Sequence, residues 1–146
     1  MAVTTMRKEE REAFLADLHV GVLSVTQDGR GPLTVPIWYS YVPGGAVTVI
    51  TGSGSLKARL INAAGRFSLC AQTETAPYKY VSVEGPVTGR EAPGDPDEHR
   101  AMAHRYLGQE LGDLYREATA ERSKDNCVFR MTPESWHTSD FAKEHS

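Results

Sequence analysis

Short apolar segments joined by tight turns are the feature that most constrains how this chain folds. Asp28-Gly29, between two such segments, supplies the positive φ angle that a two-residue hairpin turn needs. Pro43-Gly44-Gly45 turns the chain again after the second segment. Strands joined this closely pair antiparallel. We therefore expect a largely antiparallel sheet.

Six segments have the alternation, or the β-branched and aromatic content, that is typical of strands. They cover residues 19–26, 33–42, 46–51, 66–72, 78–90 and 126–138. Pro36 lies inside the second segment and has no amide hydrogen to donate, which indicates an edge strand, a bulge or an unpaired stretch. The segment 46–51 is apolar enough to be buried on both faces.

Helices are expected at three places along the chain. Residues 6–18 and 56–64 carry apolar side chains at helical spacing. A third helix begins after Asp95, is interrupted at Gly108 and continues to residue 118. Together with the strands, these helices predict a mainly β fold: a six-stranded, largely antiparallel small barrel with helices against its ends, formed as a single domain by residues 1–146.

The composition argues against several classes of protein. With 16 Lys and Arg against 19 Asp and Glu, the net charge of −3 provides no basic field for nucleic acid. No apolar run approaches the ~18 residues of a membrane span, and the first residues lack the apolar centre of a signal peptide. Cys70 and Cys127 form no CxxC pair, so we expect a reduced, cytoplasmic protein.

Motifs for metal binding and for an activated serine are missing from the sequence. It contains no H-E-x-x-H motif, no Cys/His cluster and no G-x-S-x-G motif. His99 and His104 are separated by about 140° around a helix, so they do not share a face. We therefore expect no metal site and assign no catalytic acid or base.

The clearest local signal for a ligand is the Gly- and Ser-rich loop at residues 51–55, where a strand ends and a helix begins. The start of a helix offers free amides and the positive end of its dipole to an anion. With Leu56 facing the core, Lys57 and Arg59 should reach back over the loop from either side. The alternative is a solvated first turn with two ordinary surface cations.

Aromatic residues mark a second candidate site. Pro36, Ile37, Trp38 and the tyrosine after them form an apolar cluster on a strand that contains a proline. Such a cluster either lines a pocket for a flat ring or packs in the core or at an interface. The pair of tyrosines around Lys79 is open to the same two interpretations.

The order of these motifs resembles the pyridoxamine 5′-phosphate oxidase-like split β-barrel family, and most closely its branch of flavin and deazaflavin oxidoreductases. The resemblance runs from about residue 7 to residue 139. It rests on the Asp-Gly hairpin, Pro36-Ile37-Trp38-Tyr39, the Ser55-x-Lys57-x-Arg59 turn, the segment from Tyr78 to Pro86 and the helical segment from Met102 to Gly108.

The resemblance implies a fold, an assembly and a binding site. The fold is an FMN-binding split barrel, and the assembly is a homodimer with two cofactor sites at the subunit interface. A flavin-type ring would lie along Pro36, Ile37, Trp38, Ile50 and Thr51. The cofactor phosphate would lie at Ser55, Lys57 and Arg59. Tyr78 and Trp136 would approach the pocket, from the same chain or from its partner.

The resemblance also implies a reaction. The arginine-rich C-terminal segment with which the founding oxidase binds its substrate is missing here, so the vitamin B6 reaction is not expected. The deazaflavin branch fits better and implies an oxidoreductase that uses coenzyme F420 to transfer hydride to or from a small unsaturated or aromatic molecule. The alternatives are an FMN-dependent oxidase or flavin reductase of the same fold, and a carrier that binds the cofactor without turnover.

Overall fold

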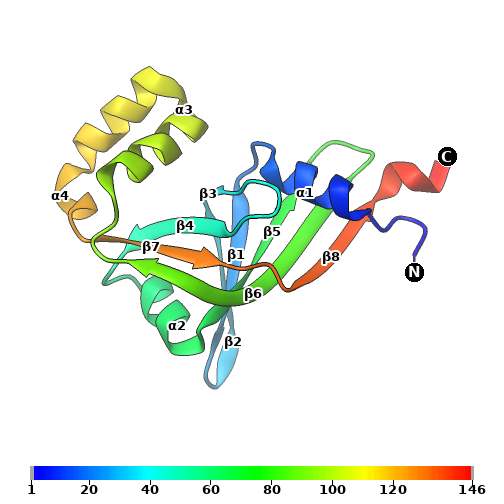
Figure 1. The fold of residues 1–146 in the computed structure, drawn as a ribbon, viewed down its shortest axis with the longest axis horizontal. Coiled ribbons are helices and arrows are strands. Elements are labelled where there is room, and N and C mark those ends of the chain that lie inside the picture. Colours follow the sequence, from blue (N-terminus) through cyan, green and yellow to red (C-terminus); the bar gives the residue numbers. More distant parts are fainter. Residues whose placement is uncertain (1, 146) are drawn as a thin grey trace.

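A curled antiparallel sheet organises residues 2–145, the part of the chain that the computed structural model describes (Figure 1). Its strands follow the order β2-β1-β5-β6-β7-β4-β3, and β8 pairs with β6 beside this path. Every pairing is antiparallel, as the tight turns predicted. The strands are β1 (Gly21–Gln27), β2 (Arg30–Ile37), β3 (Tyr39–Ser40), β4 (Val47–Gly52), β5 (Arg66–Gln72), β6 (Lys79–Glu91), β7 (Asn126–Met131) and β8 (Ser135–Asp140).

The long strand β6 belongs to both halves of the split barrel. Its first half pairs with β5 on one side and β8 on the other, and its second half pairs with β7. The predicted single strand over 126–138 is therefore wrong, because the chain crosses β6 between β7 and β8. Gly85 permits the crossing, since a Cβ there would overlap the carbonyl oxygen of Thr132. The Glu134 amide donates to the Glu84 carbonyl at 2.9 Å and fixes the crossing point.

The predicted strand over 33–42 is also two strands. β2 ends at Ile37, Trp38 is unpaired, and the short β3 leaves β1 to pair with β4. Pro36 lies opposite Val22 on β2, an edge strand, which confirms the prediction from its missing amide hydrogen. The break at Trp38 is held from outside the sheet, because the Tyr39 amide donates to the Tyr106 hydroxyl at 3.0 Å.

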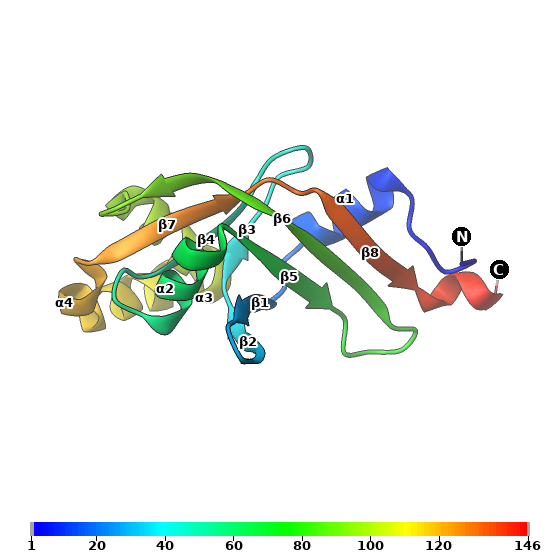
Figure 2. The same cartoon turned by 90° about the horizontal axis from the view of Figure 1, so that it is seen from below.

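The helices lie around the outside of the curled sheet (Figures 1 and 2). One end of the molecule carries the C-terminal segment and the first helix, and the other end carries the long helix over residues 96–118 and the short helix after it. The helices are α1 (Lys8–Ala16), α2 (Leu56–Ala64), α3 (Pro96–Ala118), α4 (Ala120–Ser123) and the 3₁₀ helix η1 (Phe141–His145).

Helix α3 consists of two arms folded against each other at Gly108 (Figure 1). Gly108 has φ 80° and ψ 173°, a conformation that favours glycine. The arms approach so closely that a Cβ on Gly112 would come within 2.6 Å of the His104 ring. His104 Nε2 lies 2.7 Å from Asp113 Oδ1 and bridges the arms. The interruption predicted from Gly108 is therefore a sharp reversal of direction.

The core lies inside the curled sheet. The predicted burial of the segment 46–51 on both faces is confirmed, because Val47 and Val49 are fully buried and Thr48 and Thr51 are buried beside them. Helix α1 closes one opening, and the Tyr39 hydroxyl donates to the Leu15 carbonyl at 2.6 Å. The largest fully buried side chains are Tyr39, Phe129, Leu15, Leu23, Ile61, Leu69, Met131, Val47, Val49, Val81, Val83 and Val128.

Candidate functional site

A hollow of about 370 Å³ lies where β4 ends and α2 begins. Its walls come from the Trp38 break, from the end of β4, from the first turn of α2 and from α3, α4 and the start of β7. It is lined by Trp38, Ile50, Thr51, Gly52, Ser55, Lys57, His99, Met102, Tyr115, Arg122, Ser123 and Asn126. Polar and cationic groups thus meet an aromatic wall in one concave site, which is the usual composition of a small-molecule pocket.

The start of α2 forms the polar end of this hollow. Ser55 caps the helix, with its hydroxyl accepting from the Ala58 amide at 3.1 Å, and lies 3.2 Å from the Thr51 hydroxyl. The loop before it is anchored by a 2.7 Å hydrogen bond from the Ser53 amide to the Asp125 carbonyl. Lys57 is half-buried and forms no ion pair with any carboxylate of residues 2–145. The local charge is therefore positive and available to an anion.

The aromatic end is built around Trp38. Its ring stacks on Tyr106 with a centroid distance of 5.1 Å and an interplanar angle of 5°, and Tyr115 lies 5.2 Å away at 51°. The Tyr106 hydroxyl donates to the His19 carbonyl at 2.6 Å while accepting from the Tyr39 amide. The two arms of α3 thus hold Trp38 in place from the side opposite the sheet.

A second hollow of about 270 Å³ adjoins the first and shares Trp38, Ile50 and Tyr115 with it. Its other lining residues are Val20, Pro36 and Ile37. Most of the residues expected at a cofactor site therefore line two adjoining hollows. They are Pro36, Ile37, Trp38, Ile50, Thr51, Ser55 and Lys57.

Arg59 does not line either hollow, because it lies on the exposed side of α2. The expectation that Leu56 faces the core is wrong, since its exposed fraction is 43% while Ala58 and Ile61 are fully buried. Lys57 lines the hollow, whereas Arg59 lies on the exposed side of the helix.

Tyr78 and Trp136 also lie elsewhere in the chain. Tyr78 precedes β6 and is 53% exposed. Trp136, on β8, packs edge-on against Tyr41 at 6.3 Å and lies beneath the Arg11 guanidinium at 4.6 Å. Together with Lys8 it lines a separate hollow of about 320 Å³ beside α1. Within one chain, these two residues do not meet the others.

The sequence did not identify the lining residues that α3, α4 and β7 supply. Arg122 and Ser123 reach the hollow because α3 folds back at Gly108 and α4 follows it, and Asn126 reaches it because it pairs with Gly52 at the end of β4. The one signal for this arrangement was Gly108 itself, which marked an interruption but not its direction. His99 lines the site from the first arm, which precedes the reversal.

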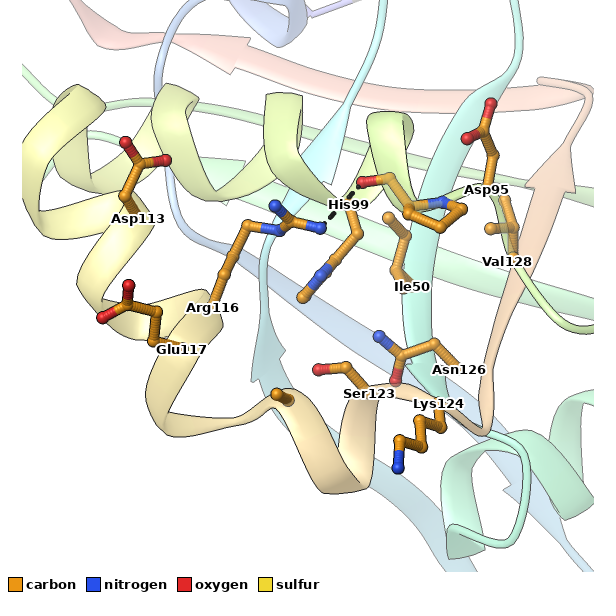
Figure 3. A pocket seen from close by; sticks show the side chains of 13 residues that line it. Ile50, Asp95, His99, Asp113, Arg116, Glu117, Ser123, Lys124, Asn126 and Val128 are labelled. Atoms are coloured by element: carbon orange, nitrogen blue, oxygen red, sulfur yellow. Dashed lines mark hydrogen bonds between the residues drawn. The ribbon is translucent and has the colours of Figure 1, made fainter.

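A further cavity of about 590 Å³ lies between the arms of α3, α4 and the β4–β7 surface (Figure 3). It adjoins the first hollow and shares Ile50, His99, Ser123 and Asn126 with it. Burial, reinforced by the nearby Arg116 guanidinium, lowers the pKa of His99, so its imidazole is neutral at pH 7. The three hollows together form one continuous concave surface on this side of the sheet.

No three His, Cys, Asp or Glu side chains among residues 2–145 come together in a way that could hold a metal ion. None of the helices in the described part of the chain has the length and apolar character required to cross a membrane.

The model of the pyridoxamine 5′-phosphate oxidase family matches residues 7–140. A search of curated protein sequences found no match. Among solved structures, the conserved hypothetical protein Rv2991 from Mycobacterium tuberculosis is similar with a TM-score of 0.75 and 20% identity, over 100% of this chain and 92% of that one.

Two other solved structures carry names that mention a cofactor. An F420 reductase is similar with a TM-score of 0.62 and 17% identity, over 86% of this chain and 94% of that one. A FAD-binding protein from Mesorhizobium loti has a TM-score of 0.61 and 20% identity, over 91% and 94% of the two chains. At these identities the structures establish the split-barrel fold alone. With the family model covering nearly the whole sequence, the chain belongs to the pyridoxamine 5′-phosphate oxidase family.

Proposed function

We propose that this chain is an oxidoreductase that binds coenzyme F420 and transfers hydride to or from a small unsaturated or aromatic substrate. The observation that carries the proposal is the two-ended hollow, in which Trp38 lies at one end and the capped start of α2 with Lys57 lies at the other. A phosphorylated cofactor with a flat ring needs both ends. The F420 reductase among the similar structures supports the choice of deazaflavin.

The phosphate end fits an anion in its chemistry. The Leu56 and Lys57 amides of the first turn of α2 have no partners within the helix, while the Ala58 amide bonds to the Ser55 hydroxyl. The Thr51 and Ser55 hydroxyl groups lie beside them. Lys57 adds a point charge, and Arg122 lines the same hollow from α4. Arg59 joins this set only if its side chain swings back over the first turn of α2.

The ring end fits a flat apolar group. Pro36, Ile37 and Ile50 supply apolar surface, and Trp38 closes the hollow between them and α3. Pro36 leaves one strand position without an amide donor, so the cofactor ring meets the carbonyl and side-chain surface there. When bound, the cofactor supplies hydride transfer. The chain holds and orients it and excludes water, and no side chain is required to act as an acid or base.

We propose a homodimer, because Tyr78 and Trp136 cannot reach the hollows of their own chain. Trp136, Arg11 and Lys8 form a cationic and aromatic surface at the opposite end of the molecule from α3 and α4. In a dimer this surface of one protomer is free to complete the site of its partner. Sedimentation equilibrium tests the assembly: a mass near twice 16.0 kDa is expected, and a monomer would remove these two residues from the site.

Parallel titration of cofactor-free protein with coenzyme F420 and with FMN, followed by ligand fluorescence, tests the cofactor. Tight binding of F420 with weak binding of FMN is expected. The reverse preference would make the protein an FMN-dependent enzyme of the same fold. Turnover of quinones or enones with the reduced cofactor then separates an enzyme from a carrier. Failure to bind either cofactor would refute the proposed function.

A further inference from the structure

The cavity between the arms of α3, α4 and the β4–β7 surface has the dimensions of a binding compartment and lies beside the proposed cofactor site without being part of it. Its volume of about 590 Å³ falls within the range of small-molecule pockets. Ile50 forms an apolar floor on the sheet, above the fully buried Val128, and Pro96 and Ala120 add apolar surface from the helices. The cavity meets the first hollow at Ile50 and His99, so a molecule bound there lies next to the cofactor.

Polar groups converge on the centre of this cavity (Figure 3). The side chains of His99, Ser123 and Asn126 point inward, while the carboxylates of Asp95 and Glu117 point outward in this view. Two of the remaining charges are already satisfied. Asp113 bonds to His104 at 2.7 Å, and Lys124 pairs with Glu121 at 3.0 Å.

Arg116 differs from Asp113 and Lys124, because its charge has no such partner among the described residues. One terminal nitrogen donates to the Pro96 carbonyl at 3.2 Å, but its Nε is buried and has no hydrogen-bond partner within residues 2–145. Nor does it form an ion pair with a carboxylate of the described chain. A buried, charged donor without a partner is costly, so such groups usually have a ligand, water or ion that satisfies them.

Two other arginines with a buried, unpaired Nε show why Arg116 differs. The Arg11 guanidinium lies over the Trp136 ring at 4.6 Å, and that of Arg105 lies between the Tyr39 and Tyr106 rings, within 6 Å of each centroid. Aromatic faces therefore stabilise those two cations. Over the part of the chain that the structure describes, no aromatic ring lies against Arg116 in this way.

We propose that this cavity is the substrate compartment, and that it takes a flat organic acid whose carboxylate is bound by Arg116. A planar guanidinium matches a carboxylate with parallel hydrogen bonds, and the flat body of the acid rests on Ile50 and on the apolar surface of Pro96 and Ala120. Asn126 and Ser123 are placed to bond a second polar group. The assignment to a substrate rests on the proposed function, whereas the binding of an organic acid does not.

Ligand binding by the full chain without added cofactor tests the compartment. The probes are 2-naphthoate and 2-naphthamide, which share a shape and differ in charge. Calorimetry or ligand-observed NMR measures the binding of each. The wild type is expected to bind the acid at least tenfold more tightly than the amide. Arg116→Met should remove this preference. Arg100→Met, an equal change of charge at an exposed position of the same helix, should leave it unchanged.

A second variant keeps the test decisive if Arg116→Met does not fold. Ala120→Trp adds a ring at the wall of the cavity without removing a charge, and it should weaken both probes at least tenfold. Equal wild-type affinity for the two probes, or unchanged acid binding in Ala120→Trp, would overturn the proposal. So would unchanged acid binding in a folded Arg116→Met variant.

Repeating the titration with cofactor present shows whether Arg116 binds a carboxylate of the substrate or one of the cofactor. Saturating coenzyme F420 should leave 2-naphthoate bound, since the two occupy adjoining hollows. Displacement of the probe would assign Arg116 to a carboxylate of the cofactor and overturn the assignment to a substrate. If F420 does not bind but 2-naphthoate does, the proposed function fails while the organic-acid site stands.

Discussion

Removing the Tyr106 hydroxyl should destabilise the fold at the point where the site is built. This group donates to the His19 carbonyl at 2.6 Å and accepts from the Tyr39 amide at 3.0 Å. Tyr39 is fully buried, so in Tyr106→Phe its amide loses its partner with no water to replace it. Leaving a buried donor unsatisfied costs about 1–3 kcal/mol, and loss of the bond to His19 adds about 1 kcal/mol. The expected loss of stability is therefore about 2–4 kcal/mol.

Urea denaturation at pH 7 measures this loss, as a lower midpoint with an unchanged slope. The matched control is Tyr115→Phe. The Tyr115 ring also contacts Trp38, but its hydroxyl makes no hydrogen bond to any residue from 2 to 145. That variant should change stability by less than about 0.5 kcal/mol. If Tyr106→Phe is no less stable than Tyr115→Phe, the hydroxyl does not anchor the break at Trp38 and the reasoning fails.

Two further substitutions test the crossing of β6 and the contact between the chain ends. Gly85→Ala places a Cβ against the Thr132 carbonyl, so it should cost about 3 kcal/mol or more, whereas Gly31→Ala, with open space around it, should be nearly neutral in the same denaturation experiment. The hydrogen bond from Lys143 lowers the pKa of Glu10 to about 2, against an ordinary 4.5. A lowered carboxyl pKa stabilises the fold above the unfolded value, and this stability is lost as the pH falls from about 4.5 to 2. Glu10→Gln should therefore flatten the pH dependence of the unfolding midpoint in this interval, and an unchanged profile would contradict the assignment.

The strands and turns were predictable because their signals are local. The Asp28-Gly29 turn and the alternating segments led directly to antiparallel neighbours, and a helix beginning after Ser55 follows from its capping side chain. The breaks within predicted strands were not predictable in the same way. The chain leaves its strand at Trp38 and crosses β6 near Thr132 because of contacts with Tyr106 and Gly85, which are distant in sequence.

The candidate site likewise has a part with a local sequence signal and a part without one. Ser55 and Lys57 lie two positions apart at the start of a helix, so the anion-binding end of the site could be predicted from the sequence. Arg116 and Arg122 enter the site only when α3 reverses at Gly108, and no pattern of neighbouring residues encodes that reversal's direction. Positions placed by tertiary contacts alone were therefore missed.

The affinity of the Lys57→Ala variant for coenzyme F420 tests the central claim most directly. A charge-assisted contact with a phosphate contributes about 1.5–3 kcal/mol, so the variant should bind about 10- to 100-fold more weakly than the wild type. Arg100→Ala, which removes the same charge from an exposed helix face, should bind like the wild type. Equal affinity of all three proteins for F420 would contradict the account, because the cofactor phosphate would then lie elsewhere than at the start of α2.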